Sequence, residues 1–297
     1  MTVIELIEAC SARLTEAGVS FGQGTTNAFD EAAWLVLWRL QMPLDALDAV
    51  EELEVDDVHL AAVHALIDQR ISTRQPAAYL TGEAWLQGVP FTVDARCIIP
   101  RSLIAEPLAE GSIDAWLSDR TRRVLDLCTG NGSLAVLAAM AWPEVTVDAA
   151  DLSTDALAVA RLNIHRHQLA DRITLHCGDG LAAVAGQAYD LILCNPPYVN
   201  QASMDALPAE FNAEPALALA GGADGMDFIR RLLREAAQHL TPDGVLVLEI
   251  GHERPHFDAA FPTLDVVWLP TSAGDDQVLL LTRTALTALP STLPLSP

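Results

Sequence analysis

Lysine is absent from this chain: all 17 basic residues are arginines, against 40 aspartates and glutamates. The missing lysine excludes a Walker-type phosphate loop, a pyridoxal Schiff base and any lysine nucleophile. The formal charge of −23 argues against a sequence-independent grip on nucleic-acid phosphates, because such binding needs a basic face. An acidic protein is instead attracted to basic macromolecules, so we expect a basic partner.

Long apolar runs and paired cysteines are also missing. No apolar run approaches the roughly 20 residues that span a bilayer, and an amino terminus with Glu5 and Glu8 does not resemble a signal peptide. The five cysteines form no CxxC pair and the histidines lack metal-motif spacing, so neither disulfides nor a metal site are expected. These absences predict a reduced, cytoplasmic protein without a membrane part.

The remaining sequence divides into four regions. Apolar residues at helical spacing in residues 1–80 predict a helical amino-terminal domain, to which we assign substrate recognition. Residues 81–100 contain β-branched and aromatic residues around turn formers, which predicts a β-hairpin linker. Strand-like and helix-like segments alternate in residues 101–284, as in a Rossmann-like α/β domain with a seven-stranded, mostly parallel sheet. The proline-rich residues 285–297 are expected to form a flexible tail.

Seven strands are predicted in the third region, with helices between most of them. The last strands follow one another closely in the sequence, without an obvious helix between them, which favours antiparallel pairing at the end of the domain. The strands are Arg123–Leu127, Val145–Ala150, Ile173–His176, Asp190–Cys194, Val245–Ile250, Asp265–Trp268 and Val278–Leu281, and the helices include Leu134–Ala141, Thr154–Gln168 and Asp227–Leu240.

A strongly acidic stretch, Asp45 to Asp57, has seven carboxylates in thirteen positions. One interpretation is a solvated loop and helix start, and the other is a docking face for a basic partner.

The stretch VLDLCTGNG, from Val124 to Gly132, takes a predicted strand through a glycine-bearing turn into a predicted helix. Glycine allows the backbone to approach a ligand at the carboxyl edge of an α/β sheet. Asp126 would repel a pyrophosphate but suits an ammonium group, so the turn favours an amino-acid-bearing nucleoside. A purely structural turn is the alternative.

Two further acidic residues follow the next two predicted strands. A carboxylate at Asp151 can accept both hydroxyls of a ribose, although it could also cap the following helix. Asp179, followed by Gly180, can accept from an exocyclic adenine amine or belong to a plain turn. Together the three strand ends describe adenosine that carries an α-amino acid, which is S-adenosylmethionine.

Asn195, Pro196, Pro197 and Tyr198 directly follow a buried, apolar strand. The Asn195 amide oxygen and the Pro196 carbonyl can each accept one hydrogen of a substrate NH2 group, because Pro197 keeps this stretch out of a helix. Tyr198 offers a flat face for a planar group. Two acceptors on one conjugated nitrogen orient its lone pair and favour rehybridisation during methyl transfer. An ordinary Asn-Pro turn is the alternative.

The segment Asn195–Tyr198 resembles the signature of methyltransferases that act on amino groups of adenine, cytosine or glutamine side chains. Over about residues 65–284 the chain is similar to the glutamine branch, the protein-(glutamine-N5) methyltransferases. The segment after Arg101 resembles the matching segment of enzymes that methylate large-subunit ribosomal protein L-three more than that of enzymes that methylate release factors. The motifs of this resemblance are QRISTRQPAAYLTGEAW, IIPRS, LDLCTGNG, EPALAL and GGADGMDFIRRLL.

The resemblance implies a class I S-adenosylmethionine-dependent methyltransferase that methylates a glutamine amide and releases S-adenosyl-L-homocysteine. It implies catalytic roles for Asn195, Pro196 and Tyr198, which would bind substrate together with Pro197. The implied cofactor residues are Asp126, Cys128, Thr129, Gly130, Asn131, Gly132, Asp151, Asp179, Gly180 and Asn195.

The implied partner is ribosomal protein L-three, whose basic character fits the acidic chain, with nucleic acid met only through ribosomal assembly intermediates. Three alternatives stay open: methylation of the GGQ glutamine of release factors, a DNA amino-methyltransferase, and a non-catalytic scaffold that keeps the cofactor pocket. Two departures from the family pattern are Cys128, where many relatives have glycine, and the glycine-poor stretch SAGDDQVLLL.

Overall fold

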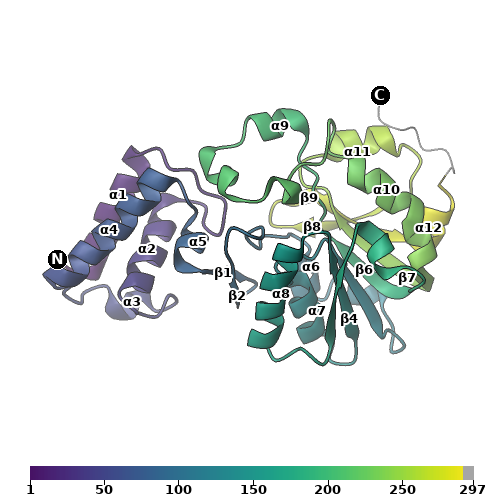
Figure 1. Cartoon of the computed structure of the whole chain (residues 1–297), viewed down its shortest axis with the longest axis horizontal. Helices are drawn as coiled ribbons and strands as arrows, with labels where there is room; N and C mark the ends of the chain where they lie inside the picture. Colours follow the sequence, from purple (N-terminus) through teal and green to yellow (C-terminus); the bar gives the residue numbers. More distant parts are fainter. Residues whose placement is uncertain (290–297) are drawn as a thin grey trace.

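The computed structural model describes residues 1–289 and has a helical amino-terminal part beside a larger α/β part (Figure 1). The amino-terminal helices enclose an apolar core of their own, which includes Leu6, Leu35 and Ile67. Helix α1 begins at a capping box, in which the side chains of Thr2 and Glu5 each accept from the other's backbone N–H. The helices are α1 (Val3–Glu16), α2 (Ala28–Arg39), α3 (Leu47–Val50), α4 (Asp57–Thr73) and α5 (Ala77–Thr81).

The α/β part is built on one seven-stranded sheet in the order β5-β4-β3-β6-β7-β9-β8. Strands β3 to β7 run parallel to one another, and β9 lies antiparallel between β7 and β8. The strands are β3 (Arg123–Leu127), β4 (Thr146–Asp151), β5 (Ile173–Cys177), β6 (Tyr189–Cys194), β7 (Leu240–Glu249), β8 (Val267–Thr271) and β9 (Gly274–Thr282).

Helices cover both faces of this sheet, each over a separate apolar core (Figure 1). Val124 of β3 packs with residues of α6, α7 and α8, whereas Leu125 packs with residues of α10, α11 and α12. Successive side chains point to opposite faces, so the central strands must be apolar throughout. The helices are α6 (Ala105–Ala109), α7 (Ser133–Ala141), α8 (Thr154–Arg166), α9 (Gln201–Asp205), α10 (Asp227–Glu235), α11 (Arg254–Ala260) and α12 (Arg283–Thr287).

A hairpin of β1 (Glu83–Leu86) and β2 (Val89–Thr92) connects the two parts. Gln87 and Gly88 both have positive φ, 49° and 72°, as a two-residue type I′ turn requires. The fully buried Asn163 of α8 accepts from the Thr92 N–H at 2.7 Å and donates to the Thr92 carbonyl at 3.0 Å. It also donates to the Asn131 carbonyl at 2.9 Å, so one side chain joins the hairpin to the turn after β3.

The predicted fold class is confirmed, since the sheet has seven mostly parallel strands and every predicted strand overlaps an observed one. Strand β8 begins two residues after the predicted start at Asp265, because its pairing with β9 starts only at Val267. Within residues 1–289, no helix is both long and apolar enough to cross a membrane.

The predicted division of the chain has structural counterparts, but the function of each region stays a prediction. Helices occupy the first region up to Thr81, and the hairpin lies inside the predicted linker. Helix α12 overlaps the start of the predicted tail, and residues 290–297 of that tail lie outside the described residues.

Replacing Asn163 by alanine should lower the free energy of unfolding by about 3 kcal/mol, because three backbone groups lose their hydrogen-bond partner. Urea denaturation measures this loss. Gln201→Ala, which removes an exposed bond to Asp205, is the matched control and should change stability by less than about 0.5 kcal/mol. A loss below about 1 kcal/mol for Asn163→Ala would contradict the assigned role.

Candidate active site

A cavity of about 510 Å³ lies at the carboxyl edge of the parallel strands. Open α/β sheets bind ligands at this edge, and the volume suits a small-molecule site. Of the predicted site residues, all but Gly132 line the cavity. The lining ones are Asp126, Cys128, Thr129, Gly130, Asn131, Asp151, Asp179, Gly180, Asn195, Pro196, Pro197 and Tyr198.

The turn after β3 depends on left-handed backbone at three positions: Cys128, Gly130 and Gly132 have φ of 61°, 54° and 81°. A Cβ at Gly132 would lie 3.1 Å from the Cβ of Ala160, so this glycine allows α7 to start close to α8. Cys128 takes a conformation that favours glycine, at a cost of roughly 1 kcal/mol. The departure from the family pattern therefore keeps the turn geometry.

Asp126 lies beneath this turn and is 1% exposed. Its Oδ2 accepts from the Thr129 hydroxyl and from the Ala135 N–H, whereas its Oδ1 has no hydrogen-bond partner among residues 1–289. Burial raises the pKa of Asp126 to about 7, although the two donors lower it. A buried acceptor without a partner is costly, so its place in the cavity wall suits a cationic ligand group.

Asp151 ends β4 and is bound to the same turn. One carboxylate oxygen accepts from the Gly130 N–H at 2.9 Å and the other from the Ser153 N–H at 2.8 Å. Burial raises the pKa of Asp151 despite these donors. The side chain that caps α8 is Ser153, which accepts from the Ala156 N–H, so helix capping is not the main role of Asp151.

Asp179 follows β5 and forms an ion pair with Arg231 of α10. Both carboxylate oxygens accept from the guanidinium at 2.6 Å, and this pairing lowers the pKa of Asp179. Arg231 also lies 5.1 Å from the centre of the Phe228 ring. Gly180 has a φ of 58°, so its left-handed backbone favours glycine, although an added Cβ would meet Arg231 only at an ordinary contact distance of 3.5 Å. Arg231 and Phe228 line the cavity but were not predicted from the sequence.

Asn195 leaves the sheet beside the turn after β3, because Cys194 of β6 pairs with Leu127 of β3. Within the described part of the chain, no donor or acceptor is hydrogen-bonded to the Asn195 side chain, and none is bonded to the Pro196 carbonyl. Asn195 and Pro196 both belong to the residues that line the cavity. The Asn195 side-chain oxygen and the Pro196 carbonyl are thus both free to accept a hydrogen bond from a ligand.

Tyr198 is fixed by a buried carboxylate that sequence reasoning missed. Its hydroxyl donates to Glu249 Oε1 at 2.9 Å, while Glu249 Oε2 accepts from the Ser102 hydroxyl at 2.7 Å and the Leu103 N–H at 2.9 Å. Burial raises the pKa of Glu249, against the effect of the donors. The sequence did contain a sign of Glu249, because this acidic residue ends an apolar strand in the same way as Asp151.

The GGADG stretch encloses the other side of Tyr198. A Cβ at Gly221 would lie 2.7 Å from the Tyr198 backbone, and a Cβ at Gly225 would lie 2.2 Å from its carbonyl oxygen. At Gly251, where φ is 53°, a Cβ would meet the Tyr198 ring at 2.4 Å. These glycines allow the backbone to pack directly on Tyr198.

An apolar segment forms the outer wall of the cavity. The guanidinium of Arg101 lies 5.5 Å from the centre of the Phe211 ring and makes a two-pronged ion pair with Glu214, at 2.7 Å and 2.9 Å. Neither Arg101 nor Phe211 was predicted as a site residue. The sequence gives little sign of their role, because Arg101 contacts Phe211 and Glu214 across more than a hundred positions of the chain. The apolar lining includes Leu207, Phe211, Pro215, Leu217 and Leu219.

Comparisons with known proteins show which family the chain resembles. The family model described as "Methyltransferase small domain" matches residues 113–226. The chain is 55% identical to the ribosomal protein uL3 glutamine methyltransferase of Bordetella pertussis, with 95% of each chain covered. It is 49% identical to the enzyme of the same name from Burkholderia pseudomallei, over 97% of this chain and 96% of that one.

Among solved structures, the hMettl16 catalytic domain in complex with MAT2A 3'UTR hairpin 1 has a TM-score of 0.51 at 16% identity. The match covers 80% of this chain and 83% of that one, and at this identity it shows the fold alone.

The sheet has the class I methyltransferase fold, and the relatives at 55% and 49% identity make the chain a methyltransferase, an enzyme whose expected cofactor is S-adenosylmethionine. The chain belongs to the family of ribosomal protein uL3 glutamine methyltransferases. The resemblance inferred from the motif at Asn195–Tyr198 is thereby confirmed.

The pKa of Asp126 predicts how stability depends on pH. An unfolded aspartate has a pKa near 4, and the folded value is about 7, so the folded state binds this proton more tightly. Relative to Asp126→Asn, the cofactor-free wild type should lose stability as pH rises from about 4 to about 7, by at most about 1.4 kcal/mol per pH unit.

Urea denaturation of both proteins at several pH values measures this difference. The asparagine variant is the matched control, because it keeps the side-chain shape and every other titrating group. A difference in unfolding free energy that stays constant from pH 4 to 8 would contradict the raised pKa.

Proposed function

We propose that this chain transfers a methyl group from S-adenosylmethionine to the side-chain amide nitrogen of a glutamine in ribosomal protein uL3. The observation that carries the proposal is the pair of acceptors, Asn195 Oδ1 and the Pro196 carbonyl, that have no partner among residues 1–289 and line a cavity beside the turn after β3. The high identity to enzymes named for uL3 supports the choice of substrate.

The cavity fits the cofactor at three points. The unpartnered Oδ1 of Asp126 suits the ammonium group, and the carboxylate of Asp151 suits the ribose hydroxyls. Asp179 and Gly180 are assigned to the adenine end, where Arg231 already occupies both oxygens of Asp179. The adenine amine must therefore share that carboxylate with Arg231. The assigned turn residues are Cys128, Thr129, Gly130, Asn131 and Gly132, with Asn195 beside them.

The protein acts mainly by positioning. When bound, S-adenosylmethionine supplies a methyl group on a sulfonium centre and leaves as S-adenosylhomocysteine. Asn195 Oδ1 and the Pro196 carbonyl each accept one N–H of the substrate amide, which turns the nitrogen lone pair out of conjugation and toward the cofactor side of the cavity. The ring of Tyr198, held by Glu249, packs on the amide plane and excludes water.

No general base is assigned. The three donors on Glu249 already use both of its oxygens, and Asp126 lies beneath the cofactor turn. The methylated amide is acidic enough to release its extra proton to water.

The charge of the chain supports a basic protein substrate that is met in the cytoplasm, either free or in a ribosomal assembly intermediate. The acidic stretch from residue 45 to 57 is largely solvent-exposed, as a docking face requires. Its exposed carboxylates are Asp45, Asp48, Glu52, Glu54, Asp56 and Asp57.

Transfer of labelled methyl from S-adenosylmethionine tests the proposal. Purified uL3, a release factor and unmethylated DNA are offered in parallel, and mass spectrometry maps the label. We expect label on one glutamine of uL3. Label on the release factor would keep the mechanism and change the substrate, whereas label on DNA or no transfer would overturn the proposed function.

Asn195→Ala should reduce turnover on uL3 by at least about 100-fold with little change in cofactor affinity, because it removes an acceptor needed in the transition state. Asn200→Ala is the matched control: its side chain caps the short α9 and bonds Glu253. An Asn195→Ala variant with more than about a third of wild-type turnover would exclude the assigned role.

A further inference from the structure

The outer wall of the cavity is an apolar segment with little regular structure. We call residues 207–219 the substrate wall; it contains only two short 3-10 helices, Ala209–Ala213 and Ala216–Ala218. Leu207, Phe211 and Leu217 of this wall line the cavity. Helices this short are not stable on their own. Contacts with other parts of the protein must therefore fix the position of the wall.

Two buried glutamates of the wall face away from the cavity lining. Glu210 is 2% exposed and Glu214 is 5% exposed, and neither lines the cavity. Glu214 binds the end of the linker through the Ile99 N–H at 2.9 Å and the residue that follows the linker, Arg101. Glu210 binds only the amino-terminal region, so the wall is connected to both regions.

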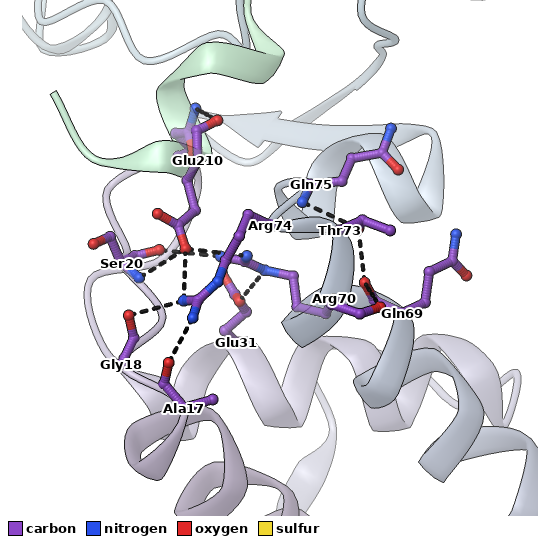
Figure 2. A network of polar contacts seen from close by, with 12 residues as sticks. Ala17, Gly18, Ser20, Glu31, Gln69, Arg70, Thr73, Arg74, Gln75 and Glu210 are labelled. Carbon is purple, nitrogen blue, oxygen red and sulfur yellow. Dashed lines mark hydrogen bonds and ion pairs between the residues drawn. The ribbon is translucent and has the colours of Figure 1, made fainter.

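Glu210 lies in a polar network that Figure 2 shows from close by. Its Oε1 accepts from the Ser20 N–H at 3.1 Å and from Arg74 at 3.3 Å, and it lies 3.6 Å from a guanidinium nitrogen of Arg70. The amide of Gln23 donates to the Glu210 carbonyl at 3.5 Å and to Glu214 at 2.8 Å. All donors come from the amino-terminal region.

Both arginines are themselves held in place. Arg70, 1% exposed, donates to Glu31 at 2.8 Å and to the Ser20 carbonyl at 3.0 Å. Arg74 ends α4 with a φ of 57°, and its guanidinium donates to the Ala17 and Gly18 carbonyls, as Figure 2 shows. The network is therefore rigid on the side of the helices.

The charge state of Glu210 agrees with this arrangement. Burial alone would raise its pKa, but the backbone donors and the two arginines together lower it. A buried charge that loses its partners is strongly destabilising locally, so the wall is held in one position rather than sliding among several.

We infer that Glu210 is a positioning residue through which the amino-terminal helices hold the substrate wall, so that these helices shape the pocket for the glutamine-bearing segment. The inference rests on the proposed function in assigning the wall to the protein substrate. Phe211, next to Glu210, packs on Arg101 inside the cavity. A displaced Glu210 therefore moves a side chain that contacts the substrate, and the QRISTRQP motif, which contains Arg70 and Arg74, acquires a structural role.

Glu210→Gln tests this inference in the full-length enzyme. It keeps the side-chain shape and removes the charge that faces the two arginines. We expect hydrogen exchange of the backbone amides in residues 207–219, followed by mass spectrometry, to become about tenfold faster. The KM for uL3 should rise about tenfold, because binding must then order the wall, whereas affinity for S-adenosylmethionine should stay within about twofold.

Two further variants complete the experiment. Arg74→Gln removes a half-exposed donor and should change exchange and KM in the same direction by a smaller factor. Asp68→Asn removes an exposed ion pair with Arg13 in the same helices, away from the wall, and should leave both quantities unchanged.

The outcomes separate the two claims. Glu210→Gln with exchange and KM equal to those of Asp68→Asn would overturn the inference, and so would faster exchange throughout the protein together with lost cofactor affinity. If the wild type does not methylate uL3, the proposed function fails. Faster exchange confined to residues 207–219 in Glu210→Gln would then still support the role of Glu210 in holding the wall.

Discussion

The parallel pairing of β3 with β6 is the constraint on which the site depends. This pairing places Leu127 beside Cys194, so the two loops that follow leave the sheet from neighbouring positions at one edge. Strands β4 and β7 flank this pair, which brings Asp151 and Glu249 to the same edge. The order of four adjacent strands thus brings together the turn after β3, Asp151, Asn195 and the carboxylate that supports Tyr198.

Buried carboxylates connect segments of the chain that are not held together by the sheet. Glu249 connects Tyr198 to the segment directly after the linker, Glu214 connects the end of the linker to the substrate wall, and Glu210 connects that wall to the amino-terminal region. In a chain without lysine, the cationic partners of Glu214 and Glu210 are guanidinium groups, and that of Arg101 binds both carboxylate oxygens of Glu214 and fixes its orientation. Such joints contribute geometric specificity more than net stability.

Sequence reasoning found what depends on local pattern. Apolar strands with Asp126, Asp151 or Asn195 near their ends predicted the sheet and the edge at which the cavity lies, because strand ends and turns are encoded by adjacent residues. It missed Glu249 and the contacts of Glu210, since their partners lie far away in sequence and only the fold brings them together. The pairing of Asp179 with Arg231 went unpredicted for the same reason.

Similarity to family motifs also marked segments whose role the hydrophobic pattern does not indicate. The stretches QRISTRQP and GGADG mark the family without revealing a function in the sequence. In the structure, the first holds Glu210 and the second packs on Tyr198, so both support the site from outside its contact surface.

The most direct test of the account is a crystal structure of the enzyme with S-adenosylhomocysteine and a uL3 segment that contains the glutamine. The product cofactor stops the reaction before methyl transfer. The account predicts the glutamine amide nitrogen within about 3.2 Å of both Asn195 Oδ1 and the Pro196 carbonyl, with the Tyr198 ring on its plane. A glutamine bound with its carbonyl oxygen toward Asn195, or outside this cavity, would contradict the central claim.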